Sequence, residues 1–221
     1  MATPTRPYVP SHVVTDNYAA GMLAMQDGRL SDATTYLSNE PVDSPCHALA
    51  HGNLAMVQLR LGRFESAEAT ARETLAEIHF TGCPHPPSWV QFVRTLGESL
   101  ASQERYEESF EAFNRAGNLA DELAADEVDF AREIELEKAH AFNSWGWVRL
   151  QFGDPNVAVE ILLLARRIYA KYSDTNRVGR AETQTNYGLA LWQAGRLTSA
   201  DLNLREALSE AQADQNADQV C

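Results

Sequence analysis

The stretch TQTNYGLALWQAGRLTSADLNLREALSEA, residues 183–211, holds at its centre a phrase, QAGRLTSA, that recurs along the chain. Related phrases are QDGRLSDA, RLGRFESA and QFGDPNVA, and SQERYEES is a fifth in which glutamate replaces the glycine. If this glycine or glutamate marks each unit, the markers are Gly28, Gly62, Glu104, Gly153 and Gly195. The first spacing is 34 residues, which is a period of repeats that stack helix pairs. The later spacings are 42, 49 and 42 residues, which implies longer helices or longer connections.

Small and large residues keep fixed places around each marker. Seven residues before it are Gly21, Ala55, Gly97, Gly146 and Gly188, and five residues after it are Ala33, Ala67, Ser109, Ala158 and Ala200. Nine residues after it are Leu37, Ala71, Phe113, Leu162 and Leu204, which are mostly large and apolar. Small residues let two helix backbones approach closely. The pattern therefore predicts two antiparallel helices in each repeat, one on either side of the marker.

With five such units in series, the chain resembles the tetratricopeptide repeat family over residues 11–214. Its last unit resembles the 42-residue variety found in kinesin light chains and many bacterial regulators. The resemblance implies an all-α fold, a right-handed α-solenoid of about five antiparallel helix pairs in a single domain. We expect helices at 12–27/30–39, 45–61/64–79, 88–103/106–124, 128–152/155–172 and 177–194/197–213. Residues 1–10 contain three prolines and are predicted to be an extended or disordered arm, and residues 215–221 a tail.

Three helix starts have recognisable local signals. Ser44-Pro45 and Asp154-Pro155 each read as an N-cap residue followed by proline at the first helical position. Ser88 and Gln91 have the spacing of a capping box.

Composition excludes several classes of function. The 221 residues include 31 acidic and 18 basic side chains, a formal net charge of −13, which repels nucleic-acid phosphates and anionic membrane surfaces. No apolar run approaches the roughly 18 residues that a membrane span needs, and we see no signal peptide. Three cysteines without a CxxC pair argue against a disulfide framework. We therefore expect a cytoplasmic protein that binds neither nucleic acid nor membrane.

The resemblance implies that residues six and three positions before each marker face a concave groove. These are Met22, Met25, Met56, Leu59, Glu98, Ala101, Trp147, Leu150, Leu189 and Trp192. Eight of the ten are large and apolar, and methionine and tryptophan are suited to binding apolar partners. We therefore predict that the groove binds a protein or peptide. The alternative interpretation is that Trp147 and Trp192 belong to the core.

Polar residues near the groove narrow the kind of partner. Ten positions before the markers, only Arg94 and Asn143 suit the carboxylate clamp of chaperone-binding relatives, and we expect Arg94 to pair with Glu98 one turn away. A clamp is therefore not predicted. Asn53 and Asn186 resemble the asparagines with which kinesin-light-chain-like repeats bond a peptide backbone; bonding to a neighbouring turn is the alternative.

Metal-binding and catalytic patterns are weak. His47 and His51 follow Cys46 on one predicted helix, and His79, Cys83 and His85 lie near one loop, but neither group has recognised zinc spacing. No nucleotide loop, metalloprotease or nucleophile motif is present. We predict no metal, no cofactor and no enzymatic activity. The remaining functions are a binding scaffold, a regulatory or sensing module of a larger effector, and a self-associating structural oligomer.

The end of the array raises one further question. Solenoids normally finish with a helix whose outer face is polar, and we recognise no such helix after residue 213. The last helix caps itself, the open end forms a homodimer, or the chain is an N-terminal fragment of a larger protein.

Overall fold

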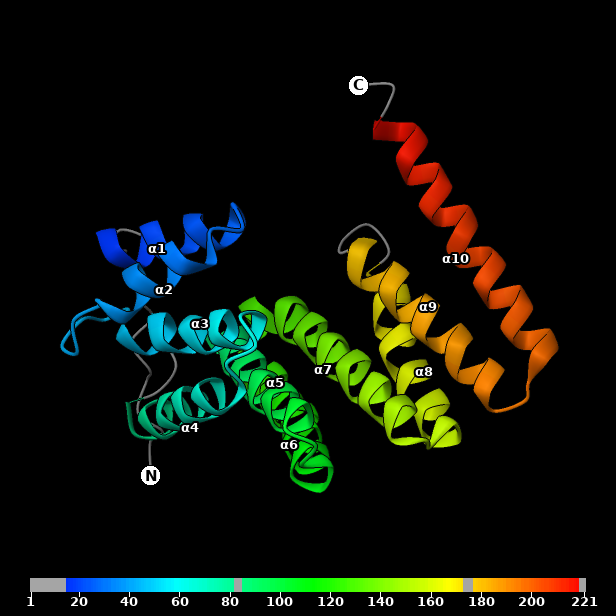
Figure 1. Ribbon diagram of the computed structural model, residues 1–221, viewed down its shortest axis with the longest axis horizontal. Coiled ribbons are helices and arrows are strands. Elements are labelled where there is room, and N and C mark those ends of the chain that lie inside the picture. The colour runs from blue at the N-terminus through cyan, green and yellow to red at the C-terminus, as the bar shows by residue number, and fades with distance from the viewer. Residues whose placement is uncertain (1–14, 82–84, 173–176, 219–221) are drawn as a thin grey trace. The chain divides into compact units, whose positions relative to one another are not determined.

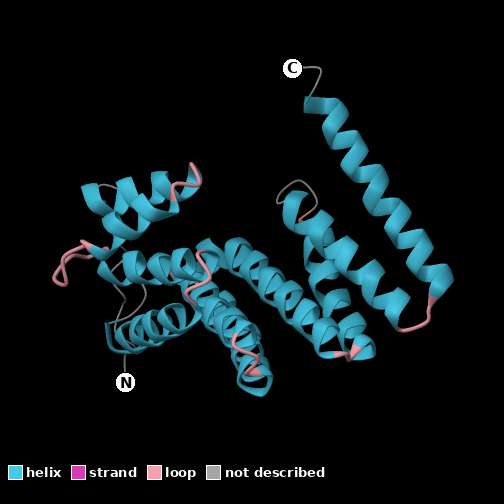
Figure 2. Cartoon of the chain, in the orientation of Figure 1, coloured by secondary structure: helices cyan, strands magenta, loops and turns pink. Residues whose placement is uncertain are grey.

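The computed structural model describes residues 15–81, 85–172 and 177–218, and in these ranges the regular elements are helices (Figure 2). They are α1 (Asp16–Gln26), α2 (Leu30–Ser38), α3 (His47–Arg60), α4 (Phe64–Thr81), α5 (Pro86–Ser102), α6 (Tyr106–Asp126), η2 (Val128–Phe130), α7 (Ala131–Phe152), α8 (Pro155–Lys171), α9 (Arg177–Gln193) and α10 (Leu197–Asp218). Consecutive α-helices form antiparallel pairs from α1/α2 to α9/α10 (Figure 1). The predicted all-α fold of five helix pairs is confirmed over the described residues.

The chain forms two compact units, Met1–Ile134 and Glu135–Cys221, and the boundary falls inside α7. In the first unit, α2 packs on α3, α4 on α5, and the first helices α3 and α5 also touch. In the second unit, α8 packs on α9. A single domain over residues 11–214 stays a prediction.

The marker residue turns the chain between the two helices of every pair. Its φ is positive in all five repeats: 72° at Gly28, 73° at Gly62, 60° at Glu104, 91° at Gly153 and 74° at Gly195. Glycine takes this left-handed conformation without steric cost, whereas a residue with a Cβ atom is strained in it. Glu104 is therefore the structural equivalent of the glycines, as the sequence pattern predicts.

Each pair closes through the residues seven before and nine after the marker. A Cβ atom added to the small residue would collide with the large one in the pairs Gly21–Leu37 (2.6 Å), Gly97–Phe113 (2.9 Å), Gly188–Leu204 (2.5 Å) and Gly146–Leu162. In the second repeat the large residue is replaced by Ala71, and Ala55 stands where the others have glycine. In four pairs a bulky residue nine after the marker therefore packs against a glycine seven before it, and in the second pair both positions are alanine.

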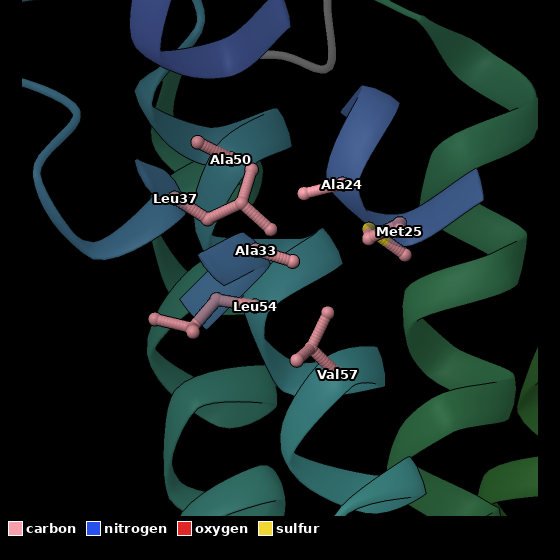
Figure 3. Close-up of a cluster of buried hydrophobic side chains, with 7 residues drawn as sticks. All are labelled: Ala24, Met25, Ala33, Leu37, Ala50, Leu54 and Val57. Carbon is pink, nitrogen blue, oxygen red and sulfur yellow. The ribbon is translucent and has the colours of Figure 1, made fainter. Parts of the chain in front are cut away.

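The first unit contains a core cluster that joins two repeats. Ala24, Met25, Ala33 and Leu37 of the first repeat pack with Ala50, Leu54 and Val57 of the second (Figure 3). In the second unit, Leu150, Ala158, Val159 and Leu162 pack with Ala190, Leu191 and Ala200. Core packing therefore runs from one helix pair into the next within each unit.

Two predicted helix starts are wrong by two residues. α3 begins at His47 because the Ser44 hydroxyl instead accepts a bond from the Cys46 amide (3.0 Å), which forms a turn across Pro45. α5 begins earlier, at Pro86, with His85 as its N-cap residue. Prolines fit a first helical turn because its amides have no partner within the helix. The third start is confirmed: α8 begins at Pro155 after Asp154.

A buried carboxylate ties the start of α1 to the segment between α2 and α3. Glu40 is 3% exposed and accepts bonds from the hydroxyls of Thr15, at 2.7 and 2.8 Å, and of Ser44. Thr15 is also the N-cap residue of α1. A buried carboxylate needs such donors because an unpaired one is strongly destabilising. This explains a glutamate at a position where the third, fourth and fifth repeats have alanine.

The predicted arm at residues 1–10, Cys83 and the connection between the predicted helices 155–172 and 177–194 lie outside the described residues. The last helix is longer than expected, since α10 continues to Asp218 rather than ending near residue 213. Residues 209–218 contain neither glycine nor proline, so nothing in the sequence interrupts the helix.

The close contact between Gly146 and Leu162 predicts that Gly146→Ala destabilises the wild-type protein but stabilises a variant that lacks the Leu162 side chain. In the wild-type background, Gly146→Ala should lower the free energy of unfolding by about 1–3 kcal/mol because the new methyl group collides with Leu162. In a Leu162→Ala background the same change should stabilise by about 1 kcal/mol, because alanine is the better helix former and the collision is gone. Urea denaturation of the four proteins measures both effects. An equal cost in both backgrounds would contradict the pairing.

The positive φ of Glu104 predicts a stabilising substitution. Glu104→Gly should raise the free energy of unfolding by about 1 kcal/mol, since it removes the strain of a left-handed glutamate. Gly195→Ala, the opposite change at an equivalent turn, should lower it by a similar amount. Thermal and urea denaturation test the pair, and destabilisation by Glu104→Gly would show that its side chain makes an overriding contact.

Candidate functional site

The predicted groove residues divide by exposure into three groups. Trp147 and Trp192 are exposed, by 40% and 58% respectively. Met22, Met56, Leu59, Arg94 and Leu189 are half-buried. Met25, Leu150, Asn53, Asn143 and Asn186 are buried. Surface for a partner is therefore provided by the first two groups.

In the first unit, the apolar candidates serve mainly to join the repeats. Met25 lies in the core cluster of Figure 3, and Met22 and Met56 pack against that cluster from its edge. Arg94 Nη1 donates to Glu98 Oε1 at 2.7 Å, which confirms the predicted ion pair. Because this pair occupies the third repeat, the first unit has no continuous apolar stripe along its first helices.

The three asparagines use their side chains inside the protein. Asn53 Nδ2 donates to the carbonyl of Leu49, one turn earlier in α3, at 2.8 Å. Asn186 Nδ2 donates to Asn143 Oδ1 at 3.0 Å, in a buried bond between α9 and α7. For Asn53, the alternative prediction of a bond to a neighbouring turn is the one observed. The Asn143–Asn186 bond shows that α7 and α9 lie side by side in the second unit.

Both exposed tryptophans belong to these two neighbouring helices. Trp147 follows Asn143 by four residues, about 6 Å along α7, and Trp192 follows Asn186 by six residues, about 9 Å along α9. The two helices run in the same direction (Figure 1). Since both side chains are largely exposed, the interpretation that they are core residues is wrong. By contrast, Leu150 lies in the core of the second unit, so its prediction as a surface residue is corrected.

One exposed apolar residue of α9 was not predicted. Val178 is 80% exposed and lies on the same helical face as Thr185, Leu189 and Trp192. Residues 178, 182, 185, 189 and 192 are spaced alternately four and three apart, which places them on one stripe of a helix. This spacing could have revealed Val178 from the sequence. We call Trp147, Val178, Leu189 and Trp192 the tryptophan face.

Histidines of the first unit form a compact cluster between α3 and α4. The His47 and His51 rings are 4.1 Å apart between centroids, and His47 Nδ1 lies 3.1 Å from Glu77 Oε2. Among the described residues, no three His, Cys, Asp or Glu side chains are arranged to hold a metal ion. His47 is thus bonded to a neighbouring carboxylate. In the other group, His79, Cys83 and His85, the cysteine lies outside the described residues.

None of the helices in the described part of the chain combines the length and the apolar character needed to cross a membrane.

No protein-family model matches this chain, and no curated protein matches its sequence. Solved structures do match. The apo form of RapI is similar with a TM-score of 0.72 and 15% identity, over 90% of this chain and 70% of RapI. Two structures of nearly identical TPR-like repeats from a putative kinesin light chain of Podospora anserina give TM-scores of 0.61 and 0.59 at 17% and 18% identity, each over 90% of this chain and 95% of theirs.

The chain has a tetratricopeptide-like repeat fold. At these identities the similarity concerns the fold alone. Within that fold, the positions shared by all repeats are the marker and the small residues around it, whereas the tryptophan face is formed by residues that differ between repeats. The tetratricopeptide fold therefore accounts for the scaffold and leaves the surface residues to decide what is bound.

The histidine cluster predicts a pH-dependent stability. Burial lowers the pKa of His51 and the charge of His47 lowers it further, against the raising effect of Glu77 and Glu73; burial also lowers the pKa of His85. The unfolded chain, with histidine pKa values of about 6.5, then binds more protons than the folded protein. Stability should therefore fall as the pH drops below about 6.5.

Urea denaturation at about pH 7.5 and 5.5 measures this loss, and His51→Gln should reduce it because one of the disfavoured protonations is removed. His79→Gln, at an exposed position of α4, is the matched control. An equal loss in wild type and His51→Gln would show that the cluster does not carry the effect.

Proposed function

We propose that this protein is a non-catalytic, cytoplasmic interaction scaffold that binds an apolar protein or peptide segment on the tryptophan face of its second unit. The observation that carries the proposal is the exposure of Trp147 and Trp192, at 40% and 58%, on adjacent first helices. Proteins with tetratricopeptide-like folds are generally interaction scaffolds, which supports the general role. Cys46 is a buried thiol that forms no disulfide, which is in keeping with a reducing compartment.

Tryptophan is among the residues that contribute most to binding energy at protein interfaces. Its large ring buries much apolar area while losing little conformational entropy, and its N–H can bond a partner. Isolated exposed leucines are ordinary on protein surfaces. The two tryptophans lie on neighbouring helices, and Leu189 precedes Trp192 by three residues, so these three residues present apolar surface that favours a partner. Val178, fourteen residues before Trp192, lies about 21 Å away along α9.

Charge is distributed in a way that suits this surface. Residues 1–134 contain 20 acidic and 9 basic side chains, a net charge of −11, whereas residues 135–221 contain 11 and 9, a net charge of −2. The second unit is therefore nearly neutral. A peptide segment with apolar residues and a net charge of either sign can approach the second unit, because this unit neither repels nor attracts charged peptides as strongly as the first unit does. Recognition there depends on apolar contacts more than on charge.

Selection from a random-peptide library tests the proposal. The wild-type protein should enrich peptides with large apolar side chains, and Trp192→Ala should weaken the binding of a selected peptide by about 30-fold, roughly 2 kcal/mol. Trp147→Ala should have a similar effect. Trp192→Ala, at the more exposed position, should change stability by no more than about 0.5 kcal/mol. Trp147 is 40% exposed, so Trp147→Ala should lower stability by about 1–2 kcal/mol, and its binding is measured where the variant is fully folded.

Leu164→Ala is the matched control, since Leu164 is 42% exposed on α8, the second helix of its pair. This variant should bind the selected peptides as wild type does. Unchanged binding by Trp192→Ala and Trp147→Ala, or loss of stability without loss of binding, would overturn the tryptophan face as the binding surface.

A further inference from the structure

The outward faces of the first and last helix pairs in the described residues differ from the equivalent faces inside the units. On the first helix, the residues twelve, nine and five positions before the marker are buried where a preceding pair lies in the same unit. These are Ala50, Asn53, Val57, Phe92, Thr95, Ser99, Thr183, Asn186 and Ala190. In α1 the equivalent residues are Asp16, Ala19 and Leu23, all exposed, with Leu23 at 55%. We call these three residues and α2's Asp32, with Arg29 before it, the N-terminal end face.

The second helices of the pairs show the same difference at the C-terminal side of the array, on α10. Residues two, six and thirteen positions after the marker are buried or half-buried in α4 and α8, which the next pair covers: Phe64, Glu68, Leu75, Pro155, Val159 and Arg166. In α10 the equivalent residues Leu197, Asp201 and Leu208 are exposed, the two leucines at 61% and 59%. Together with Leu204 and Arg205 they form the C-terminal end face.

Four charges connect the second and third repeats. Arg105 Nη1 donates to Glu68 Oε2 at 2.6 Å, and Arg72 Nη2 lies 3.6 Å from Glu108 Oε2. Within each repeat, Arg72 also bonds Glu68 at 2.9 Å, and Arg105 bonds Glu108 at 2.6 Å. The result is a closed ring of alternating charges across the junction. Burial alone would raise the pKa of Glu68, but its bonds to Gln103 and Arg72 and the nearby charge of Arg105 hold that pKa below its usual value.

Each end face carries one half of this ring. Asp201 and Arg205 occupy the positions of Glu68 and Arg72, six and ten after the marker, and bond each other at 2.9 Å. Arg29 and Asp32 occupy the positions of Arg105 and Glu108, one and four after the marker, and bond each other at 2.8 Å. The C-terminal end face therefore has the half that the second repeat presents. The N-terminal end face has the arginine and the acid that the third repeat presents, although Asp27, which bonds Arg29 at 3.0 Å, stands where the third repeat has Gln103.

This arrangement is not a general property of the repeats. An acid six and a base ten positions after the marker occur together only in the second and fifth repeats. A base one and an acid four positions after it occur together only in the first and third. The junction of the fourth and fifth repeats, for example, has Val159 and Leu163 opposite Arg196 and Ser199. The two halves of the ring meet at the junction of the second and third repeats, and otherwise one half occurs in the first repeat and the other in the fifth.

We propose that the C-terminal end face of one chain binds the N-terminal end face of a second copy, head to tail, as the second repeat binds the third. In this contact Asp201 pairs with Arg29 of the second copy, and Arg205 pairs with its Asp32. The occupant of the exposed α10 face is thus a second copy of this chain, selected by charge complementarity and by the apolar residues beside the charges.

The apolar part of the contact has its model in the first unit. Val57, five before its marker, packs in one cluster with Leu37, nine after the preceding marker (Figure 3). Leu30, two after that preceding marker, packs against the cluster. In the head-to-tail contact, Leu23 takes the place of Val57, and Leu204 and Leu197 take those of Leu37 and Leu30. Leu208 extends the apolar area toward the end of α10.

The symmetry of such a contact decides the type of assembly. Two different faces meet, so every bound copy leaves one face of each kind free and further copies can add. A dimer formed by two α10 faces would instead close after two chains. The charge of −13 per chain opposes association. Measurements should therefore be made at about 0.15 M salt, where the screening length is about 8 Å.

Sedimentation equilibrium of the 221-residue chain over a range of concentrations tests the proposal. The average mass should rise beyond that of a dimer as concentration increases. Leu208→Asp and Leu23→Asp should each remain monomeric, but an equimolar mixture should form a one-to-one complex and stop there, because each variant keeps one intact face. Leu202→Asp is the matched control, since Leu202 is 61% exposed on α10 at a position that is exposed in every repeat.

Charge exchange tests the pairing itself. Arg205→Glu and Asp32→Arg should each weaken self-association roughly tenfold, since each places like charges opposite one another. The chain with both substitutions should self-associate as wild type does, because each contact then pairs the glutamate at position 205 with the arginine at position 32 of the second copy. Arg167→Glu, an equal charge change at an exposed position of α8, should have no effect. A monomeric wild type, self-association by Leu23→Asp alone, or no recovery in the double variant would each overturn the proposal.

Discussion

The close approach of two helices at a residue without a side chain is the constraint on which this structure depends. Leu162 and Phe113 fit only because Gly146 and Gly97 provide no Cβ atom opposite them. The left-handed turn at the marker then brings the second helix back at the distance that this contact requires. Because the two features are separated by a fixed number of residues, the turn and the contact specify one another, and the connecting helices can vary in length.

That freedom explains why a stretched period leaves the fold intact. The segment around the marker, from seven residues before it to nine after, is short and constant, while insertions lengthen helices such as α6 and α7 at their far ends. Glu104 shows the strength of the constraint, since the chain adopts φ = 60° there despite the Cβ atom. A local strain of about 1 kcal/mol is small beside the packing of an entire helix pair.

The sequence was informative where the cause of structure is local and repeated. The helix pairs, the marker at Glu104 and the Arg94–Glu98 bond follow from spacing alone. Spacing could not show how polar side chains are used. Ser44 and Ser88 have the pattern of N-cap residues, but Ser44 bonds the Cys46 amide and Glu40, and prolines start α5 two residues before Ser88. These outcomes depend on which donors and acceptors tertiary packing brings together, and a single repeat does not encode that.

On the first helices, repeat spacing predicts the position of a side chain, whereas tertiary packing decides whether that side chain is exposed. Six positions before the marker, Met56 lies at the edge of a core cluster, Glu98 pairs with Arg94, and Trp147 is exposed, although the helical position is equivalent. The repeat therefore fixes where a side chain points along its own helix, while its neighbours decide whether a partner can reach it. Apolar character at a groove position is insufficient evidence of a binding site. At the groove positions of the described helices, exposed apolar side chains occur only in the second unit, at Trp147 and Trp192, so on the proposed function specificity comes from the differences between repeats.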